Sequence, residues 1–358
     1  MKKLVLIFTL LLLLSGCGPA AEEPETLEAT AASAEAVLAE TEEVTVSVET
    51  EPKEERFLLT FVGDCTLGSN PINYYAPFGF IKTVGEDWSY PFRNIGGYFL
   101  EDECSFANLE GALCDTGNPM QKKHTFRGPE AFVHILTENS VEAVTLANNH
   151  TLDYGSAAYD TTRETLDAAG IPYAERDSAV AISTKNGLTI GLYGMVYYKL
   201  DVEDMTREIA ALRDAGCELV IVAPHWGAEG SYQPTQEQID VGHAAIDAGA
   251  DIVWGSHPHV LQPIEEYNGG VIYYSLGNFA FGGNLYPKDL DSALLQQEVI
   301  RDETGIRLGE LTIVPVSVSS IEKRNNFQPT PYESGTEGYD RVLSKLDGSF
   351  SGPNLTIG

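Results

Sequence analysis

The feature that most constrains this sequence is a series of short apolar runs, each ending in a cluster of polar residues or glycine. The runs are rich in β-branched and aromatic residues, and turn residues bound them, as is typical of buried strands. Five of the runs are followed by side chains that can bind a metal or a substrate. They are 57–62 before Gly63-Asp64, 104–107 before Asn108-Leu109-Glu110, 141–147 before Asn148-Asn149-His150, 218–223 before His225-Trp226-Gly227, and 251–254 before His257-Pro258-His259.

Helix-like stretches lie between these runs, at about 155–169, 203–215 and 235–249. Each stretch reaches or is followed by a glycine, a common residue at the carboxyl end of a helix. Strands that alternate with helices predict an α/β domain. In such domains ligands bind beyond the carboxyl ends of the strands, where all five polar clusters stand.

The pattern changes after residue 270. Segments 271–276, 290–301 and 306–318 predict strands joined by hairpins, and 338–347 predicts a short helix. We expect one domain over 57–320 and a C-terminal extension over 321–358, to which the sequence assigns no function.

The polar clusters together contain carboxylates, imidazoles and amides, which are the groups that bind divalent Mn, Fe or Zn. A bridging carboxylate can hold two such ions about 3.5–4 Å apart, where they activate water. The candidate residues are Asp64, Glu110, Asn149, His150, His225, His257 and His259.

The order of these clusters resembles the calcineurin-like phosphoesterases, and in particular the CapA family of poly-γ-glutamate capsule proteins. Two further stretches, 260–263 and Tyr274-Ser-Leu-Gly-Asn-Phe279, also match, so the resemblance spans about 57–283. It implies a four-layer α-β-β-α sandwich of the metallo-dependent phosphatase type, with two divalent metal ions at the strand ends.

The resemblance also implies a role for each matched residue. Asp64 and His259 would bind the first metal, Glu110 would bridge both, and Asn149, His225 and His257 would bind the second. His150 would act beside the leaving group, with Asp153 orienting it or hydrogen-bonding the loop. Two residues after Asp64, Thr66 stands where many phosphoesterases have a histidine ligand, so the first metal would have one imidazole fewer.

Candidate substrate contacts are Arg127, Asn148, Trp226 and Asn278. The guanidinium of Arg127 can form a bidentate contact with a carboxylate or phosphate of a substrate, but it can equally pair with nearby acidic groups of the protein. Asn148 can instead cap the following turn, and Trp226 can instead pack in a core. We expect three other histidines to be structural, namely His124, His134 and His243.

The amino terminus predicts export. Lys2 and Lys3 precede an apolar run over 4–14, which suits a signal sequence better than a membrane span. The following Leu14-Ser15-Gly16-Cys17 is typical of a lipobox, so residues 1–17 would form a lipoprotein signal with Cys17 acylated. A plain signal peptide with an incidental cysteine is the alternative. We expect the protein on the outer face of the cytoplasmic membrane.

Residues 18–56 predict a disordered acidic tether, because positions 21–55 contain twelve Glu, one Lys and no aromatic residue. The whole chain has a formal net charge of −31, which argues against a nucleic-acid partner. Outside the cytoplasm the four later cysteines could form disulfides, but their irregular spacing favours buried thiols, with a Cys104–Cys114 bridge as the alternative.

Three functions fit these expectations. The first is a metal-dependent hydrolase of a phosphoester or of an amide such as a γ-glutamyl bond. The second is a non-catalytic assembly protein that binds an anionic polymer such as poly-γ-glutamate, alone or with membrane capsule-synthesis subunits. The third is a surface scaffold with a degenerate site.

Overall fold

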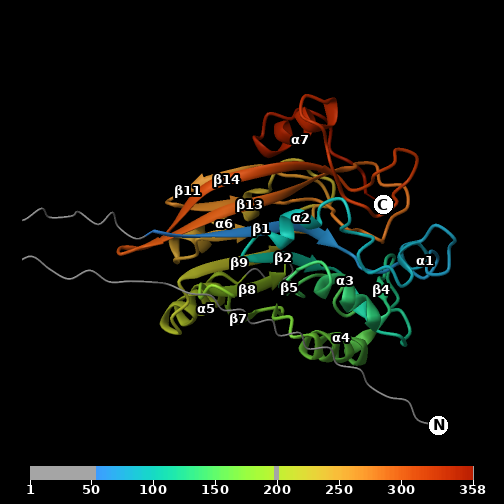
Figure 1. The fold of residues 1–358 in the computed structure, drawn as a ribbon, viewed down its shortest axis with the longest axis horizontal. Coiled ribbons are helices and arrows are strands. Elements are labelled where there is room, and N and C mark those ends of the chain that lie inside the picture. Colours follow the sequence, from blue (N-terminus) through green and yellow to red (C-terminus); the bar gives the residue numbers. More distant parts are fainter. Residues whose placement is uncertain (1–53, 197–200, 358) are drawn as a thin grey trace, which may run out of the picture. The chain divides into compact units, whose positions relative to one another are not determined.

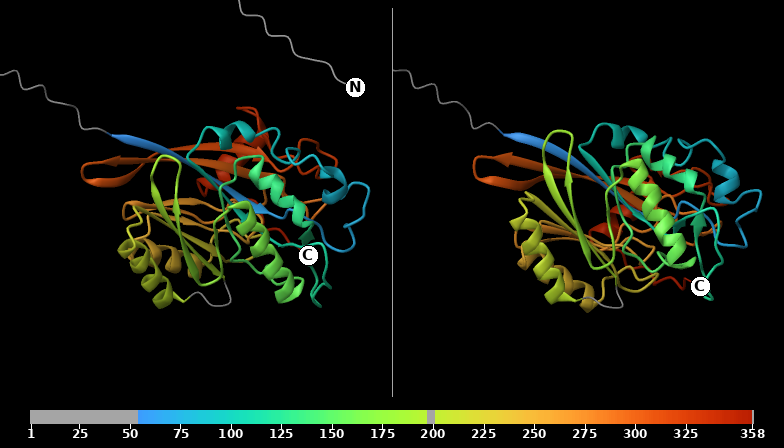
Figure 2. Two further views of the ribbon diagram at one scale, coloured as in Figure 1. Left: turned by 60° about the horizontal axis from the view of Figure 1, so that its bottom comes forward. Right: turned by 90° about the horizontal axis from the view of Figure 1, so that it is seen from below.

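The computed structural model describes residues 54–196 and 201–357. Two β-sheets pack face to face, and helices cover their outer faces (Figures 1 and 2). This is the four-layer α-β-β-α sandwich that the sequence predicts. The signal sequence and Cys17 lie outside the described residues, as does the predicted tether up to residue 53. Its last residues, Glu55 and Arg56, already belong to the first strand.

The first sheet has seven strands in the order β15-β14-β13-β1-β2-β5-β6. Strands β1, β2, β5 and the edge strand β6 run parallel, and β13 pairs antiparallel with β1. The bounds are β1 Glu55–Cys65, β2 Cys104–Leu109, β5 Ala143–Thr145, β6 Tyr173–Ala174, β13 Asp291–Asp302, β14 Gly305–Ser317 and β15 Thr330–Pro331.

The second sheet has six strands in the order β11-β12-β10-β9-β8-β7. Strands β8, β9, β10 and β12 run parallel, and both edge strands pair antiparallel with their neighbours. The bounds are β7 Ser178–Ser183, β8 Thr189–Val196, β9 Leu219–His225, β10 Ile252–Trp254, β11 Ile264–Tyr267 and β12 Gly270–Tyr273. A separate pair, β3 Ala112–Leu113 and β4 Arg127–Gly128, lies outside both sheets.

An aromatic core joins the two sheets. Phe61 of β1 stacks on Phe106 of β2 with ring centroids 5.1 Å apart, and Trp254 of the second sheet contacts both rings. Trp254 also donates its Nε1–H to the carbonyl of Val62 at 3.0 Å. Large buried aromatic rings contribute much of the apolar area in such a core, and this contact fixes the ends of β1 and β10 beside each other.

Helices form the two outer layers. On the first sheet lie α2 Gly96–Leu100, α3 Val133–Thr137 and α4 Gly155–Ala169, with η1 Glu130–Phe132 and α1 Phe80–Val84 nearby. On the second sheet lie α5 Val202–Asp214 and α6 Gln236–Asp247, side by side in Figure 2. Their starts match the expected helices within a few residues. A capping box between Thr235 and Gln238 begins α6, and Gly170 ends α4 in the left-handed conformation.

Some elements differ from the sequence-based expectation. The hairpin of β7 and β8 was not predicted, although β8 supplies Ile190 and Leu192 to the core. Strand β12 ends at Tyr273 rather than at residue 276. The chain beyond it leaves the sheet and runs to the end of β1, where Asp64 and Asn278 form an isolated bridge.

Residues 321–357 also contribute to the sandwich. Strand β15 pairs with β14, and α7 Glu337–Leu346 places Val342 and Leu346 in the core between the layers. The ammonium group of Lys345 is nearly fully buried and lies 2.6 Å from Asp289 and 2.7 Å from Asp291. Arg341 forms a second ion pair with Asp291 at 2.6 Å.

Cys65, Cys104, Cys114 and Cys217 are buried thiols, so the expectation of free cysteines is confirmed and the Cys104–Cys114 bridge does not form. Across residues 54–196 and 201–357, no helix combines the length and the apolar character that crossing a bilayer requires.

We predict that Lys345→Met destabilises the domain by about 3 kcal/mol, because it leaves two buried carboxylates with less compensating charge. Urea unfolding followed by circular dichroism measures this, with the exposed Lys323→Met as the control for loss of one charge. A change for Lys345→Met as small as that of the control would contradict the structural role of α7.

Candidate metal centre

The candidate residues come together because parallel strands of both sheets end at the same edge of the sandwich. Asp64 lies at the end of β1, Glu110 follows β2, and His225 ends β9. The loop after β5 brings Asn149 and His150, and the loop after β10 brings the two remaining histidines. Five segments that are distant in sequence therefore meet around one carboxylate, Glu110.

Close backbone packing fixes the position of Asp64. Its amide donates to the carbonyl of Gly277 at 2.8 Å, and its carbonyl accepts from the amide of Phe279 at 2.9 Å. A Cβ atom on Gly63 would lie only 2.1 Å from the Gly277 oxygen, so this position requires glycine. The sequence Gly63-Asp64 thus allows the end of β1 to pack closely against the segment around Gly277.

The first group of candidate ligands consists of Asp64, Glu110 and His259. His259 Nδ1 lies 3.1 Å from Asp64 Oδ2, and His259 Nε2 lies 3.8 Å from Glu110 Oε1. Ligands about 2.1 Å from one metal ion are separated from each other by roughly 3–3.5 Å. The two distances are measured from different nitrogens of the His259 ring, and only one of these nitrogens can bind a given ion. One ligand atom from each of the three residues lies within 4.8 Å of the other two, which is close enough for a shared ion after small side-chain rotations.

The second group of candidate ligands approaches the same Glu110 oxygen. His225 Nε2 is 3.9 Å from Glu110 Oε1, 3.0 Å from Asn149 Oδ1 and 3.1 Å from His257 Nδ1. His225 Nδ1 lies 2.8 Å from Ser256 Oγ, which fixes the ring with Nε2 toward the cluster. Such a partner on the remaining ring nitrogen is usual for metal-binding histidines.

The buried oxygens of this cluster fit a cation. Within the described residues, both carboxylate oxygens of Glu110 are buried and receive no hydrogen bond, and Asp64 Oδ2 is buried with only the His259 ring nitrogen, 3.1 Å away, beside it. A buried anionic oxygen left in this way is costly unless a positive charge compensates it. Asp64 and Glu110 together supply these three buried oxygens, beside three imidazoles and one amide oxygen.

Electrostatics lead to the same conclusion. Burial raises the pKa of Glu110 well above its usual range, and the charge of Asp64 raises it further. Burial alone would lower the pKa of His259, but the charges of Glu110 and Asp64 outweigh burial and raise that pKa to about 10. In the absence of a metal ion, the cluster of Asp64, Glu110 and His259 therefore retains a proton, which a divalent cation would replace. Burial, together with the charge of His259, lowers the pKa of His257 to about 3, so this ring is neutral and able to bind a metal.

Both histidines of the last loop have strained backbones. The φ angles of His257 and His259 are +98° and +56°, a region that residues with a side chain rarely adopt. Each such residue costs about 1–3 kcal/mol, and such strain is concentrated at functional sites. Here it turns the two imidazoles of one short loop toward the two groups of ligands.

His150 and Asp153 form a hydrogen-bonded pair next to these groups. His150 Nδ1 lies 2.7 Å from Asp153 Oδ2, and His150 Nε2 lies 3.7 Å from Glu110 Oε1. The amide of Phe126 and the ammonium group of Lys122 hold Asp153 in turn. Asp153 therefore orients the His150 ring.

Two of the four candidate substrate contacts instead hydrogen-bond candidate metal ligands or their neighbours. Asn148 donates to Asn108 Oδ1 at 3.0 Å, and Asn108 donates to Asp64 Oδ1 at 2.8 Å, so this chain of amides orients Asp64. Asn278 Oδ1 lies 3.0 Å from His259 Nδ1, and Asn278 also lines the cavity described below.

The other two need correction. Trp226 is fully buried, stacks on Tyr274 and donates to the Tyr274 carbonyl at 2.9 Å, so it packs in the core under α6 rather than lining a pocket. Arg127 donates to the carbonyls of Cys114 and Asp115, and its guanidinium lies 4.5 Å from the ring of Tyr74. Arg127 therefore joins loops, which agrees with the structural alternative.

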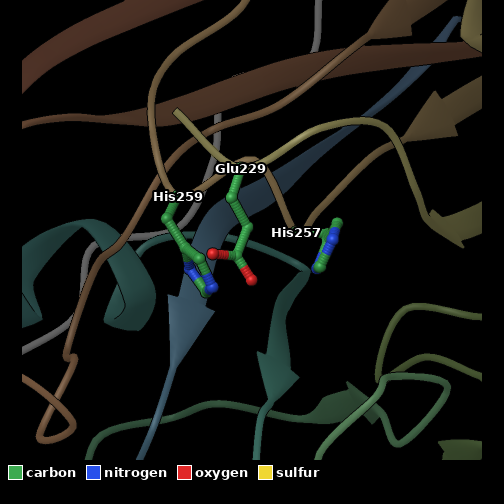
Figure 3. Close-up of side chains that lie close together, drawn as sticks. All are labelled: Glu229, His257 and His259. Carbon is green, nitrogen blue, oxygen red and sulfur yellow. The ribbon is translucent and has the colours of Figure 1, made fainter. Parts of the chain in front are cut away.

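A cavity of about 360 Å³ opens beside the ligands and is lined by His150, His259 and Asn278. Three further parts of its wall were missed or misjudged from sequence. His124, expected to be structural, lines it, as do Glu229 and the C-terminal residues 355–357. Figure 3 shows the Glu229 carboxylate beside the His259 ring, on the side that faces His257. Glu229 stands four residues after the candidate ligand His225, and this spacing is the sequence signal that could have identified it.

The chain is also similar to known proteins. A family model described as bacterial capsule synthesis protein PGA_cap matches residues 58–283. The PGA biosynthesis protein CapA of Bacillus subtilis (strain 168) is 34% identical over 297 residues, which cover 74% of this chain and 75% of that protein. The capsule biosynthesis protein CapA of Bacillus anthracis is 27% identical over 74% of this chain and 68% of its own length.

Among solved structures, the calcineurin-like phosphoesterase YfkN from Bacillus subtilis aligns with a TM-score of 0.44 and 15% identity, over 77% of this chain and 95% of that one. A phosphatase from Mycoplasma pneumoniae aligns with a TM-score of 0.43 and 12% identity, over 74% and 95%. The family match covers more than half of the chain and includes every candidate metal ligand. The chain therefore belongs to the bacterial capsule synthesis protein family PGA_cap.

Proposed function

We propose that this protein acts in the biosynthesis, export or attachment of poly-γ-glutamate or a similar anionic surface polymer, and that it does so as a two-metal hydrolase. Its relatives are named for capsule or PGA biosynthesis. The observation that carries the hydrolase part is the position of Glu110, whose buried Oε1 lies 3.7–3.9 Å from imidazole nitrogens of His150, His225 and His259.

In this proposal Asp64, Glu110 and His259 hold one divalent ion, and Glu110, Asn149, His225 and His257 hold the other. Two ions so placed would lower the pKa of a water molecule and stabilise negative charge on the bond being cleaved. The ions would also offset the strong negative charge of the chain, which otherwise repels an anionic polymer.

His150 has the geometry of a proton-transfer residue. Asp153 fixes its Nδ1, and its ring lines the cavity, so Nε2 is the nitrogen that can exchange a proton with the leaving group. Lys122 compensates the charge of Asp153 and donates to the carbonyl of Asn149 at 2.8 Å. This contact couples the His150 loop to a ligand of the second metal.

The cavity also suits a second function, metal-dependent binding of a polymer without cleavage. Its wall beyond the ligands contains amides and one ammonium group, from Asn70, Asn73, Asn284 and Lys288, and amides can hydrogen-bond the carboxylates and peptide groups of such a chain. Metal-dependent retention of γ-glutamyl oligomers, with turnover of neither these oligomers nor a chromogenic phosphodiester, would favour binding over hydrolysis.

The proposal includes attachment of the protein by a lipid on Cys17 to the outer face of the cytoplasmic membrane, within reach of membrane capsule-synthesis subunits. It is supported by the sequence Leu14-Ser15-Gly16-Cys17 after an apolar run.

We predict that His257→Ala lowers the metal content of the purified chain by at least half, because one imidazole of the second group is lost. Elemental analysis by mass spectrometry measures this, and circular dichroism verifies the fold. His243→Ala is the matched control, since His243 lies on α6, stacks on Tyr267 and pairs with Glu265. Equal metal content in the two variants would show that the ligands are misassigned.

We predict that His150→Asn leaves the metal content unchanged but lowers turnover of the cleaved substrate by about 10²–10⁴-fold, the usual contribution of a proton-transfer residue. Steady-state assays on a chromogenic phosphodiester and on γ-glutamyl oligomers measure kcat. The control is His134→Asn, on α3 beside Trp88. Full activity of His150→Asn would contradict its proposed role.

A further inference from the structure

An exposed carboxylate, that of Glu229, lies next to the candidate metal centre but belongs to neither group of ligands described above. Its oxygen and one nitrogen each of His257 and His259 all lie within 4.8 Å of one another (Figure 3). His259 also belongs to the group with Asp64 and Glu110. The trio of Glu229, His257 and His259 therefore shares His259 with the trio of Asp64, Glu110 and His259. The exposed Glu229 carboxylate lies between His259 of the first metal position and His257 of the second (Figure 3).

Without Glu229, the first metal position has few strong ligands. Asp64, Glu110 and His259 supply two carboxylates and one imidazole, whereas Thr66, two residues after Asp64, offers a hydroxyl group. The buried oxygens of Glu110, which receive no hydrogen bond in the described structure, already mark this place for a cation. A further anionic oxygen that can reach it from the cavity side would complete the shell.

The side chain of Glu229 is exposed, but the backbone next to it is hydrogen-bonded to two other segments, the β10 loop and the C-terminal residues. The amide of the next residue, Gly230, donates to the carbonyl of Pro258 at 2.8 Å, between the two histidines of the β10 loop. The Gly230 carbonyl accepts from the amide of Leu355 at 2.9 Å. A Cβ on Gly230, whose φ is +76°, would lie 2.2 Å from the Leu355 oxygen, so the loop and the C-terminal segment are in tight contact.

Two more contacts hold the C-terminal segment in place. Asn354 Oδ1 accepts from the amide of Tyr232 at 3.1 Å, and the Thr356 carbonyl accepts from Lys288 Nζ at 2.7 Å. Residues 354–356 thus form a brace across the Glu229 loop and along the cavity wall. This gives the C-terminal residues a positioning role that their sequence does not show.

We infer that Glu229 is a further ligand of the first metal, taking the place of the imidazole absent at Thr66, and that residues 354–356 position it. This inference rests on the metal centre of the proposed function. Its consequence is a metal position with three carboxylates and one imidazole. Hard oxygen ligands suit Mn²⁺ and Mg²⁺, whereas imidazole suits Zn²⁺, so this position selects Mn²⁺ relative to Zn²⁺ more strongly than a site with another histidine.

The experiment titrates Mn²⁺, and separately Zn²⁺, into the metal-stripped full chain by isothermal calorimetry. We predict that Glu229→Gln weakens Mn²⁺ binding at least tenfold, because even loss of an outer-shell partner costs 10–100-fold, and that it weakens Zn²⁺ binding less. Glu310→Gln, an exposed change of the same charge on β14, is the matched control. Removal of residues 354–358 should also weaken Mn²⁺ binding, and the circular dichroism spectrum of this shortened chain should match that of the full chain.

Glu110→Gln separates this inference from the proposed function. If Glu110→Gln loses Mn²⁺ while Glu229→Gln binds it like Glu310→Gln, the role of Glu229 is overturned and the metal centre stands. If Glu110→Gln also binds like the control, the metal centre itself is contradicted. Unchanged Mn²⁺ binding by the folded shortened chain would overturn the positioning role of residues 354–356.

Discussion

The structure around the site depends on one constraint, the burial of the Glu110 carboxylate without a hydrogen bond from any described residue. A carboxylate in this state needs a compensating positive charge. The Glu110 side chain is fully buried, and imidazoles approach its Oε1 from the end of β9 and from the loops after β5 and β10. The rest of the sandwich serves to bring these loops together at this oxygen, so the fold and the candidate metal centre cannot be explained separately.

Several costly features make sense only in relation to this centre. The strained backbones of His257 and His259 lower stability, and the aromatic core between the sheets has to offset them. The amides of Asn148 and Asn108 form a buried relay to Asp64, which orients a ligand instead of contributing to apolar packing. Position 63 is a glycine, without a side chain to pack, so that the end of β1 can approach Gly277. Each feature trades stability for the placement of a candidate ligand.

The sequence predicted the α/β class and the convergence of the strand-end polar residues because strand periodicity and polar termini are local signals, as at Gly63-Asp64 and His257-Pro258-His259. It did not predict the β7–β8 hairpin, whose pairing is a property of the sheet. Trp226 was misjudged because a loop aromatic can face the cavity or the core, and only packing decides. Glu229 was missed because its place beside His257 and His259 depends on how two loops pack together. The brace at 354–356 was missed because Leu355 and Asn354 contact Gly230 and Tyr232, which lie more than 100 positions earlier in the chain.

The most direct test of the central claim is a crystal structure of the full chain grown with Mn²⁺, with diffraction data collected on both sides of the manganese absorption edge. The account predicts two anomalous peaks about 3.5–4 Å apart, one on each side of the Glu110 carboxylate, within bonding distance of His259 and of His225. Strong anomalous peaks elsewhere, with Glu110 bound to protein groups alone, would contradict it.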